Sequence, residues 1–258
     1  MTTRMKTRFN LTFALIFLAT AIAQTATGQP RQTVDLELVL AIDTSTSVDD
    51  SEFELQWRGL ELAFQHPDVI NAIKSTGDLG IAVTLVQWSG EGQHQTAVPW
   101  THISDAQSAS RFSAKIRAVP RQMQGFTDIG GAIRYSSELF AGNGFDGLRR
   151  VIDVSGDGTS STGSPAPQRD AAVQRGIVIN GLVIIQFDYD LGELDREDLR
   201  QHYLNQVIGG PGAFLIIVSA FEDFAEAIRK KLVREINGPL FSGSTSEQRQ
   251  TAGINSTP

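Results

Sequence analysis

The stretch LVLAIDTSTSVDDSEF, residues 38–53, joins an apolar segment to a loop rich in hydroxyl groups. Residues 34–42 are mostly apolar and end in a continuous hydrophobic run, which is typical of a strand covered on both faces of a sheet. Asp43 follows this run, and residues 44–47 are then all Ser or Thr. Hydroxyl side chains at that density are poor core material, so we expect them to cap a helix or to hold a ligand.

Predicted strands and helices alternate along the rest of the chain. Asp49 and Glu52 have the spacing of a capping box, and apolar residues at helical spacing follow them. Pro99 lies in a short strand and suits an edge position. Further strands are predicted at residues 79–89, 95–100, 148–158, 176–185 and 214–219. We therefore expect an α/β fold with a doubly wound, mainly parallel sheet, helices on both faces and one short antiparallel edge strand.

The N-terminal segment has the features of an export signal. Three basic residues precede an apolar stretch at residues 11–23, which ends in a small-x-small cleavage site. An uncleaved anchor helix is the alternative, but the stretch is short for a membrane span. We predict an exported protein, periplasmic or secreted, without stable membrane insertion after cleavage. The expected organisation is a signal peptide at 1–23, a linker at 24–33, a folded domain at 34–236 and a disordered C-terminal tail at 237–258.

Charge and cysteine content limit the classes of partner. Removal of residues 1–23 leaves 19 Lys and Arg against 29 Asp and Glu, a net charge of −10. This balance argues against nucleic acid and against an anionic membrane surface as partners, because both are bound by clustered Lys and Arg. The chain contains no cysteine, so neither disulfides nor a lipidated cysteine can stabilise or anchor it.

Two aspartates are predicted at the same edge of the sheet. Asp43 ends the first strand, and Asp157 follows the apolar run at residues 151–154 in the equivalent place. If the two strands are neighbours, both carboxylates converge at their carboxyl ends. Two facing carboxylates would repel each other unless a hard cation lay between them, and oxygen donors from Asp, Ser and Thr suit Mg²⁺.

These residues carry a resemblance to a known family. Asp43-x-Ser45-x-Ser47 resembles the signature of the von Willebrand factor A domain, and Thr127 in GFTDIGGAI and Asp157 in SGDG match the two residues that complete its metal-ion-dependent adhesion site. The segments VIDVSGDG and IGGPGAF are also similar to exported bacterial A-domain-like proteins of unknown function. The resemblance implies that the five residues bind Mg²⁺, with Mn²⁺ or Ca²⁺ as alternatives. It also implies that the ion keeps one position open for an Asp or Glu of a partner protein.

Other functions remain open at this level. One alternative is that the hydroxyl groups of Ser45, Ser47 and Thr127 only cap helices and turns. A metal-dependent hydrolase or phosphotransferase is a second possibility, and a structural factor whose metal only stabilises the loops is a third. The sequence has no cysteine nucleophile and no Gly-x-Ser-x-Gly elbow. We therefore expect a binding module rather than an enzyme.

Four further acidic residues are expected to lie outside the metal site. Asp153 falls within a central strand, where we expect a backbone amide or a basic group such as Arg134 to pair with it. Asp128 follows Thr127 and either tunes the site or faces solvent, and we expect the latter. Asp188 and Asp190 only weakly resemble a calcium loop, so we interpret their segment as a solvated acidic loop at the rim of the site.

Overall fold

The computed structural model describes residues 30–185 and 193–238. The predicted signal peptide, the acidic loop around Asp188 and Asp190 and nearly all of the predicted tail lie outside these residues. Within the described ranges, no helix is long and apolar enough to cross a membrane.

The strands of the described residues form one six-stranded sheet in the order β3-β2-β1-β4-β5-β6. β3 pairs antiparallel with β2, and every other neighbouring pair is parallel. This arrangement confirms the predicted mainly parallel sheet with an antiparallel edge strand. The strands are β1 (Gln32–Asp43), β2 (Ile81–Trp88), β3 (His94–Ile103), β4 (Phe145–Gly156), β5 (Ile177–Ile184) and β6 (Leu215–Val218).

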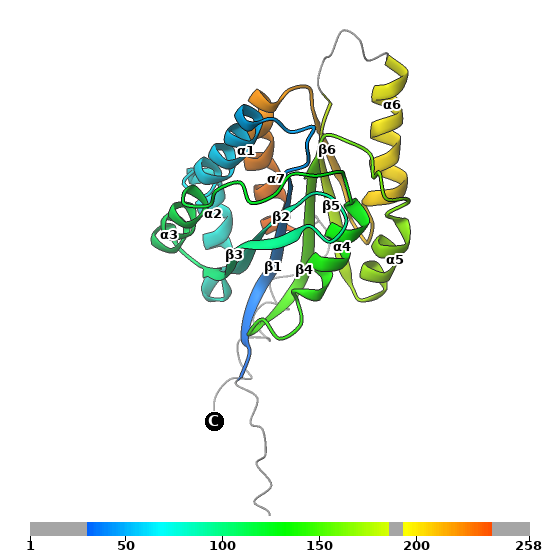
Figure 1. Cartoon of the computed structure of the whole chain (residues 1–258). Helices are drawn as coiled ribbons and strands as arrows, with labels where there is room; N and C mark the ends of the chain where they lie inside the picture. The colour runs from blue at the N-terminus through cyan, green and yellow to red at the C-terminus, as the bar shows by residue number, and fades with distance from the viewer. Residues whose placement is uncertain (1–29, 186–192, 239–258) are drawn as a thin grey trace, which may run out of the picture. The chain divides into compact units, whose positions relative to one another are not determined.

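Helices cover both faces of this sheet (Figure 1). One face carries α1 (Asp50–Ala63), α2 (Pro67–Ser75), α3 (Ala106–Arg117) and α7 (Phe224–Asn237). The other carries α4 (Ile129–Glu138), α5 (Ala166–Gln174) and α6 (Glu193–His202), and a π-helical turn, Tyr203–Val207, extends α6. Short 3₁₀ turns lie at Gly77–Leu79 and Phe221–Asp223.

The continuous apolar run of β1 follows from this two-sided cover. Leu38 and Leu40 pack into the core beneath α1 and α7, whereas Val39 and Ala41 pack into the core beneath α4. Because successive side chains of a strand point to opposite faces, a strand buried on both sides needs apolar residues at every position. The same strand carries the site, because its last residue is Asp43.

The order of the strands reverses at β1, which has β2 on one side and β4 on the other. β1 and β4 run parallel, and Ile42 is in register with Ser155 near their carboxyl ends. The loops that begin at Asp43 and Asp157 therefore follow the carboxyl ends of two adjacent parallel strands. This confirms the expectation that the two strands are neighbours, and such a switch point is where open α/β sheets bind ligands.

Candidate metal site

Asp43 forms the base of the candidate site. Its side chain is fully buried, and its Oδ1 accepts a hydrogen bond from the Ser45 backbone N–H at 2.7 Å. Its Oδ2 is buried and has no hydrogen-bond partner among the described residues. Burial and, after it, the nearby charge of Asp157 raise the pKa of Asp43 to about 8. A buried carboxylate oxygen without a donor is costly, so this position favours a cation.

A chain of oxygen atoms links the first loop to Asp157. The Ser45 Oγ and Ser47 Oγ atoms are 3.0 Å apart, and Ser47 Oγ donates to Asp157 Oδ1 at 2.7 Å. Neighbouring ligands of an octahedral Mg²⁺, each at about 2.1 Å from the ion, would lie about 3.0 Å from each other. The spacing of these oxygen atoms is thus compatible with a shared octahedral ion.

The two threonines between these residues have a different role. Thr44 donates from both its backbone N–H and its Oγ1 to the Trp88 carbonyl, at 2.8 and 3.1 Å. Thr46 does the same to the Gly125 carbonyl, at 2.9 and 3.0 Å. The hydroxyl run therefore divides by position. Its even-numbered members bind the end of β2 and the loop at Gly125, and the odd-numbered members are left for the site.

Thr127 and Asp157 come from two loops that are bonded to each other. The Thr127 N–H donates to Ser161 Oγ at 3.1 Å, and the Ser161 N–H donates to the Thr127 carbonyl at 2.8 Å. A Cβ atom placed on Gly158 would lie 3.8 Å from Thr127 Oγ1. These contacts place the Thr127 hydroxyl beside the residue that follows Asp157, so the structure brings all three predicted loops together.

Helix capping does not account for the hydroxyl groups. The N-cap of α1 is Asp49, which forms the predicted capping box with Glu52, and the N-cap of α4 is Asp128. Ser45, Ser47 and Thr127 therefore cap neither helix.

Asp128 itself differs from the expectation. It is only 6% exposed, and its Oδ1 accepts from the Gly131 N–H at 2.9 Å and from Thr162 Oγ1 at 2.7 Å. The prediction that Asp128 faces solvent was wrong, because the start of α4 is turned into the protein at this point. Its carboxylate stabilises the α4 N-terminus beside Thr127.

Arg121 is a residue of this region that the sequence did not reveal. Its Nη2 donates to the carbonyls of Thr44, Ser45 and Val48 at 3.0, 2.9 and 2.7 Å, and its Nη1 pairs with Asp50 at 3.1 Å. The guanidinium group thus holds the backbone of the first loop, although Arg121 lies 77 residues beyond Thr44. No periodicity or motif surrounds Arg121, so only the folded chain shows this role.

Tyr203 is a second residue of this kind. Its hydroxyl is buried without a hydrogen-bond partner among the described residues. A Cβ on Gly156 would lie 2.7 Å from the Tyr203 hydroxyl and 2.9 Å from Asp43 Oδ2, so both oxygens border the space above Gly156. Burial and the charges of Asp43 and Asp157 raise the Tyr203 pKa well above its usual value, which leaves a proton available for donation.

The donor set suits a hard cation that accepts hydroxyl ligands. Within residues 30–185 and 193–238, no group of three or more His, Cys, Asp or Glu side chains could hold a metal ion. A cation at this place therefore depends on serine and threonine oxygens in addition to Asp43 and Asp157. Burial also raises the pKa of Asp157, so both carboxylates lie in surroundings that oppose their charge. The residues present fit a divalent cation, which would relieve both penalties.

Comparison with known proteins assigns this chain a family but no activity. Residues 33–240 match the family described as "Protein of unknown function (DUF1194)". Among curated proteins, none matches the chain.

Several solved structures have a similar fold. One is proximal thread matrix protein 1 from the mussel byssus, whose metal-ion-dependent adhesion site (MIDAS) motif is occupied by zinc. It is 15% identical to this chain, with a TM-score of 0.56, and the match covers 79% of this chain and 48% of that one. A von Willebrand factor type A protein from Catenulispora acidiphila is 15% identical with a TM-score of 0.51, over 79% and 43% of the two chains. BatB from Bacteroides thetaiotaomicron, a conserved hypothetical protein, is 17% identical with a TM-score of 0.51, over 78% and 98%.

This chain spans less than half the length of the first two of these proteins. At such low identity the matches show the fold alone, which is of the von Willebrand factor A type.

Proposed function

The chain belongs to the DUF1194 family, and we propose that it is a binding module that uses a divalent cation to capture an acidic side chain of a partner protein. The cation would be held by Asp43, Ser45, Ser47, Thr127 and Asp157. The observation that carries the proposal is the buried Asp43 Oδ2, which has no hydrogen-bond partner among the described residues, within a hydrogen-bonded set of oxygen donors. A cation would supply the positive counter-charge that this buried carboxylate lacks.

The chemistry of the donors indicates what the ion would bind. Three of the five donors are neutral hydroxyl groups, so the ion retains an affinity for a further carboxylate. Mg²⁺ is the expected ion, with Mn²⁺ or Ca²⁺ as alternatives, because all the donors are oxygens. The zinc-occupied MIDAS motif of the mussel protein supports a divalent cation in a domain of this fold.

The net charge of the chain is consistent with a bridging cation in this role. A charge of −10 after removal of residues 1–23 opposes the approach of acidic partners, and an ion at the site would offset that repulsion locally. We propose that the chain acts outside the cytoplasm, after cleavage of that segment. Chelation of the metal should then abolish partner binding. The expectation that the chain is not an enzyme stays a prediction.

Calorimetric titration of the metal-stripped protein with Mg²⁺ and Mn²⁺ tests the proposal. Saturable binding is expected in the parent and not in Asp43→Ala or Asp157→Ala. Asp49→Ala is the matched control, because Asp49 is an acidic residue of the same region that caps α1 and belongs to no ligand set. It should lose stability and keep its cation affinity. Binding by Asp43→Ala equal to that of the parent, or no binding by the parent even with acetate present, would overturn the proposal.

A further inference from the structure

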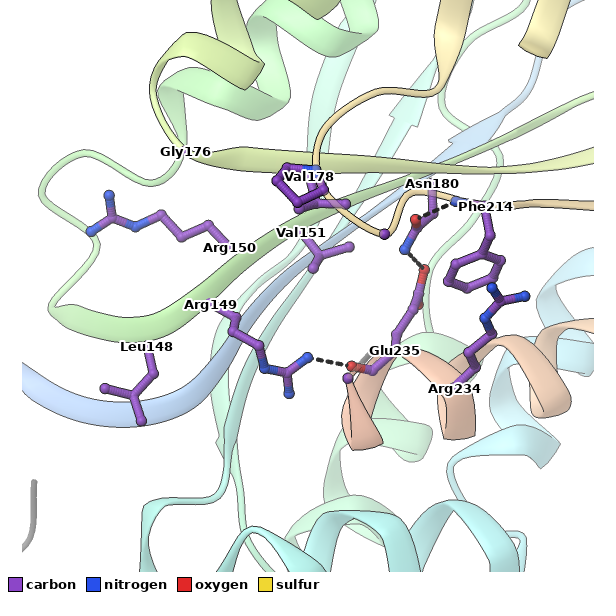
Figure 2. Close-up of a pocket in the computed structure, with 13 residues that line it drawn as sticks. Leu148, Arg149, Arg150, Val151, Gly176, Val178, Asn180, Phe214, Arg234 and Glu235 are labelled. Carbon is purple, nitrogen blue, oxygen red and sulfur yellow. Dashed lines mark hydrogen bonds between the residues drawn. The ribbon is translucent and has the colours of Figure 1, made fainter. Parts of the chain in front are cut away.

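A cavity of about 610 Å³ lies away from the metal site. It is bordered by the first halves of β4 and β5, the segment that precedes β6 and the last turn of α7 (Figure 2). Val151 lines it and precedes Asp157 by six residues, so the two lie roughly 20 Å apart along β4. The cavity is within the range of about 300–1,000 Å³ that is typical of small-molecule sites.

Apolar side chains form most of the inner wall. Val151 and Phe214 are buried, and Val178 is half-buried beside them. Leu148 and Pro211, both exposed, lie at its rim. A ligand with an apolar body would remove this surface from water, at about 25 cal/mol for each Å² covered.

Arg234 supplies a positive charge at this wall. Its guanidinium group lies against the Phe214 ring (Figure 2), with the guanidinium carbon 3.7 Å from the ring centre. The Arg234 side chain makes no hydrogen bond or ion pair within the described residues. Arg149 and Arg150 also line the cavity, but their charges are partly compensated, by Asp35 and Glu37. Arg234 is therefore the lining cation that has no ion pair within the described residues, and its donors are available to a ligand.

The acidic residue of the lining offsets this charge only in part, because it is bonded to groups inside the protein. Glu235 Oε1 accepts from Lys231 Nζ at 2.8 Å and from Asn180 Nδ2 at 2.9 Å, while its Oε2 is buried without a hydrogen-bond partner among the described residues. Asn180 in turn accepts from the Phe214 N–H at 3.1 Å, which holds the backbone that carries the ring against which Arg234 lies. The cavity thus presents a positive group above an apolar wall in a chain that is otherwise acidic.

We propose that this cavity binds an amphipathic organic anion, whose carboxylate pairs with Arg234 and whose apolar body fills the space between β4, β5 and Phe214. This site is independent of the cation site, which lies at the carboxyl ends of the strands. A charge-assisted pair with Arg234 supplies orientation, because its planar guanidinium group donates two parallel bonds to a carboxylate. The apolar contact supplies most of the affinity.

Titration of the full chain with decanoate, below its micelle concentration, tests this proposal. Decanoate should bind saturably, and 1-decanol, which has the same chain without the charge, at least about tenfold more weakly. Arg234→Gln should weaken decanoate binding by about tenfold. Lys230→Gln is the matched control on the same helix, because Lys230 does not line the cavity, and it should change nothing.

A second variant tests the cavity itself. Val178→Phe fills the space and should abolish binding, with circular dichroism as the check that the variant remains folded. No saturable binding of decanoate to the parent would overturn the proposal. Binding that both Arg234→Gln and Val178→Phe leave unchanged would do the same. Binding that appears only after Leu240 and Phe241 are replaced by serine would assign the cavity to the chain's own C-terminal segment instead, and would also overturn it.

Discussion

Two aspartates on the neighbouring strands β1 and β4 show how burial of the same group can have different outcomes. Asp43 and Asp153 are both fully buried, and burial raises their pKa values to about 8 and about 7. Asp153 pairs with Lys231 of α7, which is also fully buried. Asp43 forms no ion pair within the described residues. The charge of Arg121 lowers its pKa only slightly against burial, since that guanidinium donates to backbone carbonyls of the loop. The fold supplies one counter-charge and leaves the other to be supplied from outside.

The partner of Asp153 corrects the expectation from the sequence. Lys231, and not Arg134, forms the ion pair, and Lys231 also donates to Glu235. Two carboxylates thus share one ammonium group, and Glu235 contributes to the raised pKa of Asp153 after burial itself. A lysine in the apolar stripe of a helix gives no sign in the sequence of which strand it will face.

The largest expected effect is at this internal pair. Lys231→Met leaves Asp153 and Glu235 buried without a cation, so we expect a loss of about 3–5 kcal/mol in the free energy of unfolding at pH 8. Urea denaturation measures it. Lys230→Met is the control, since that side chain is 64% exposed, and it should change stability by less than about 0.5 kcal/mol. A similar small loss in both variants would show that Asp153 needs no counter-charge.

The second effect concerns the pH dependence at Asp43 in metal-free protein. Its carboxyl group keeps a proton in the folded state up to about pH 8 but loses it near pH 4 when unfolded, so stability falls as pH rises between these values. Asp43→Asn removes this contribution. From pH 5 to pH 7 the parent should therefore lose about 3 kcal/mol relative to the variant.

Chemical denaturation at the two pH values, with chelator present, checks this difference. Saturating Mg²⁺ should restore the free energy of unfolding that the parent loses between pH 5 and pH 7, because the bound ion takes the place of the proton on Asp43. Parallel pH profiles of the two chelated proteins would contradict the claim that Asp43 lacks a counter-charge within the fold.

A smaller effect is expected at Tyr203. Tyr203→Phe removes the hydroxyl that faces the space beside Asp43 Oδ2, so Mg²⁺ affinity should fall by about tenfold while metal-free stability changes little. Tyr135→Phe is the converse control. The Tyr135 hydroxyl accepts a hydrogen bond of 3.1 Å from the Thr96 N–H, and neither residue belongs to the proposed ligand set. It should lose about 1 kcal/mol of stability and keep its affinity. Calorimetry would contradict the role of Tyr203 if both variants bound Mg²⁺ like the parent.

The smallest effect is expected at Phe126, which precedes Thr127 and is 79% exposed. Phe126→Ala should change neither cation affinity nor, beyond about 0.5 kcal/mol, the free energy of unfolding. Thermal denaturation and Mg²⁺ titration measure both. A loss of affinity would mean that Phe126 holds the Thr127 loop, and the site would then extend beyond its oxygen donors.

Much of the fold was predictable because apolar runs and helical spacing depend on local sequence. The run that ends at Asp43 predicted a doubly covered strand, and the motif residues fell in loops that the sheet brings together. Arg121, Tyr203 and Lys231 were not predictable. Each acts through a contact with a distant segment, and none lies in a recognisable pattern. Asp128 was predicted wrongly because exposure at a helix start depends on how that helix packs.

The hold of Arg121 on the first loop bears on how fast the site would fill. Its three bonds to the carbonyls of Thr44, Ser45 and Val48 order that backbone through contacts within the chain itself. An ordered loop has little entropy left to lose when an ion arrives. Mg²⁺ gives up its own water reluctantly, more so than Ca²⁺. The association rate would then be set by dehydration of the ion and not by folding of the loop, and Ca²⁺ should enter faster than Mg²⁺.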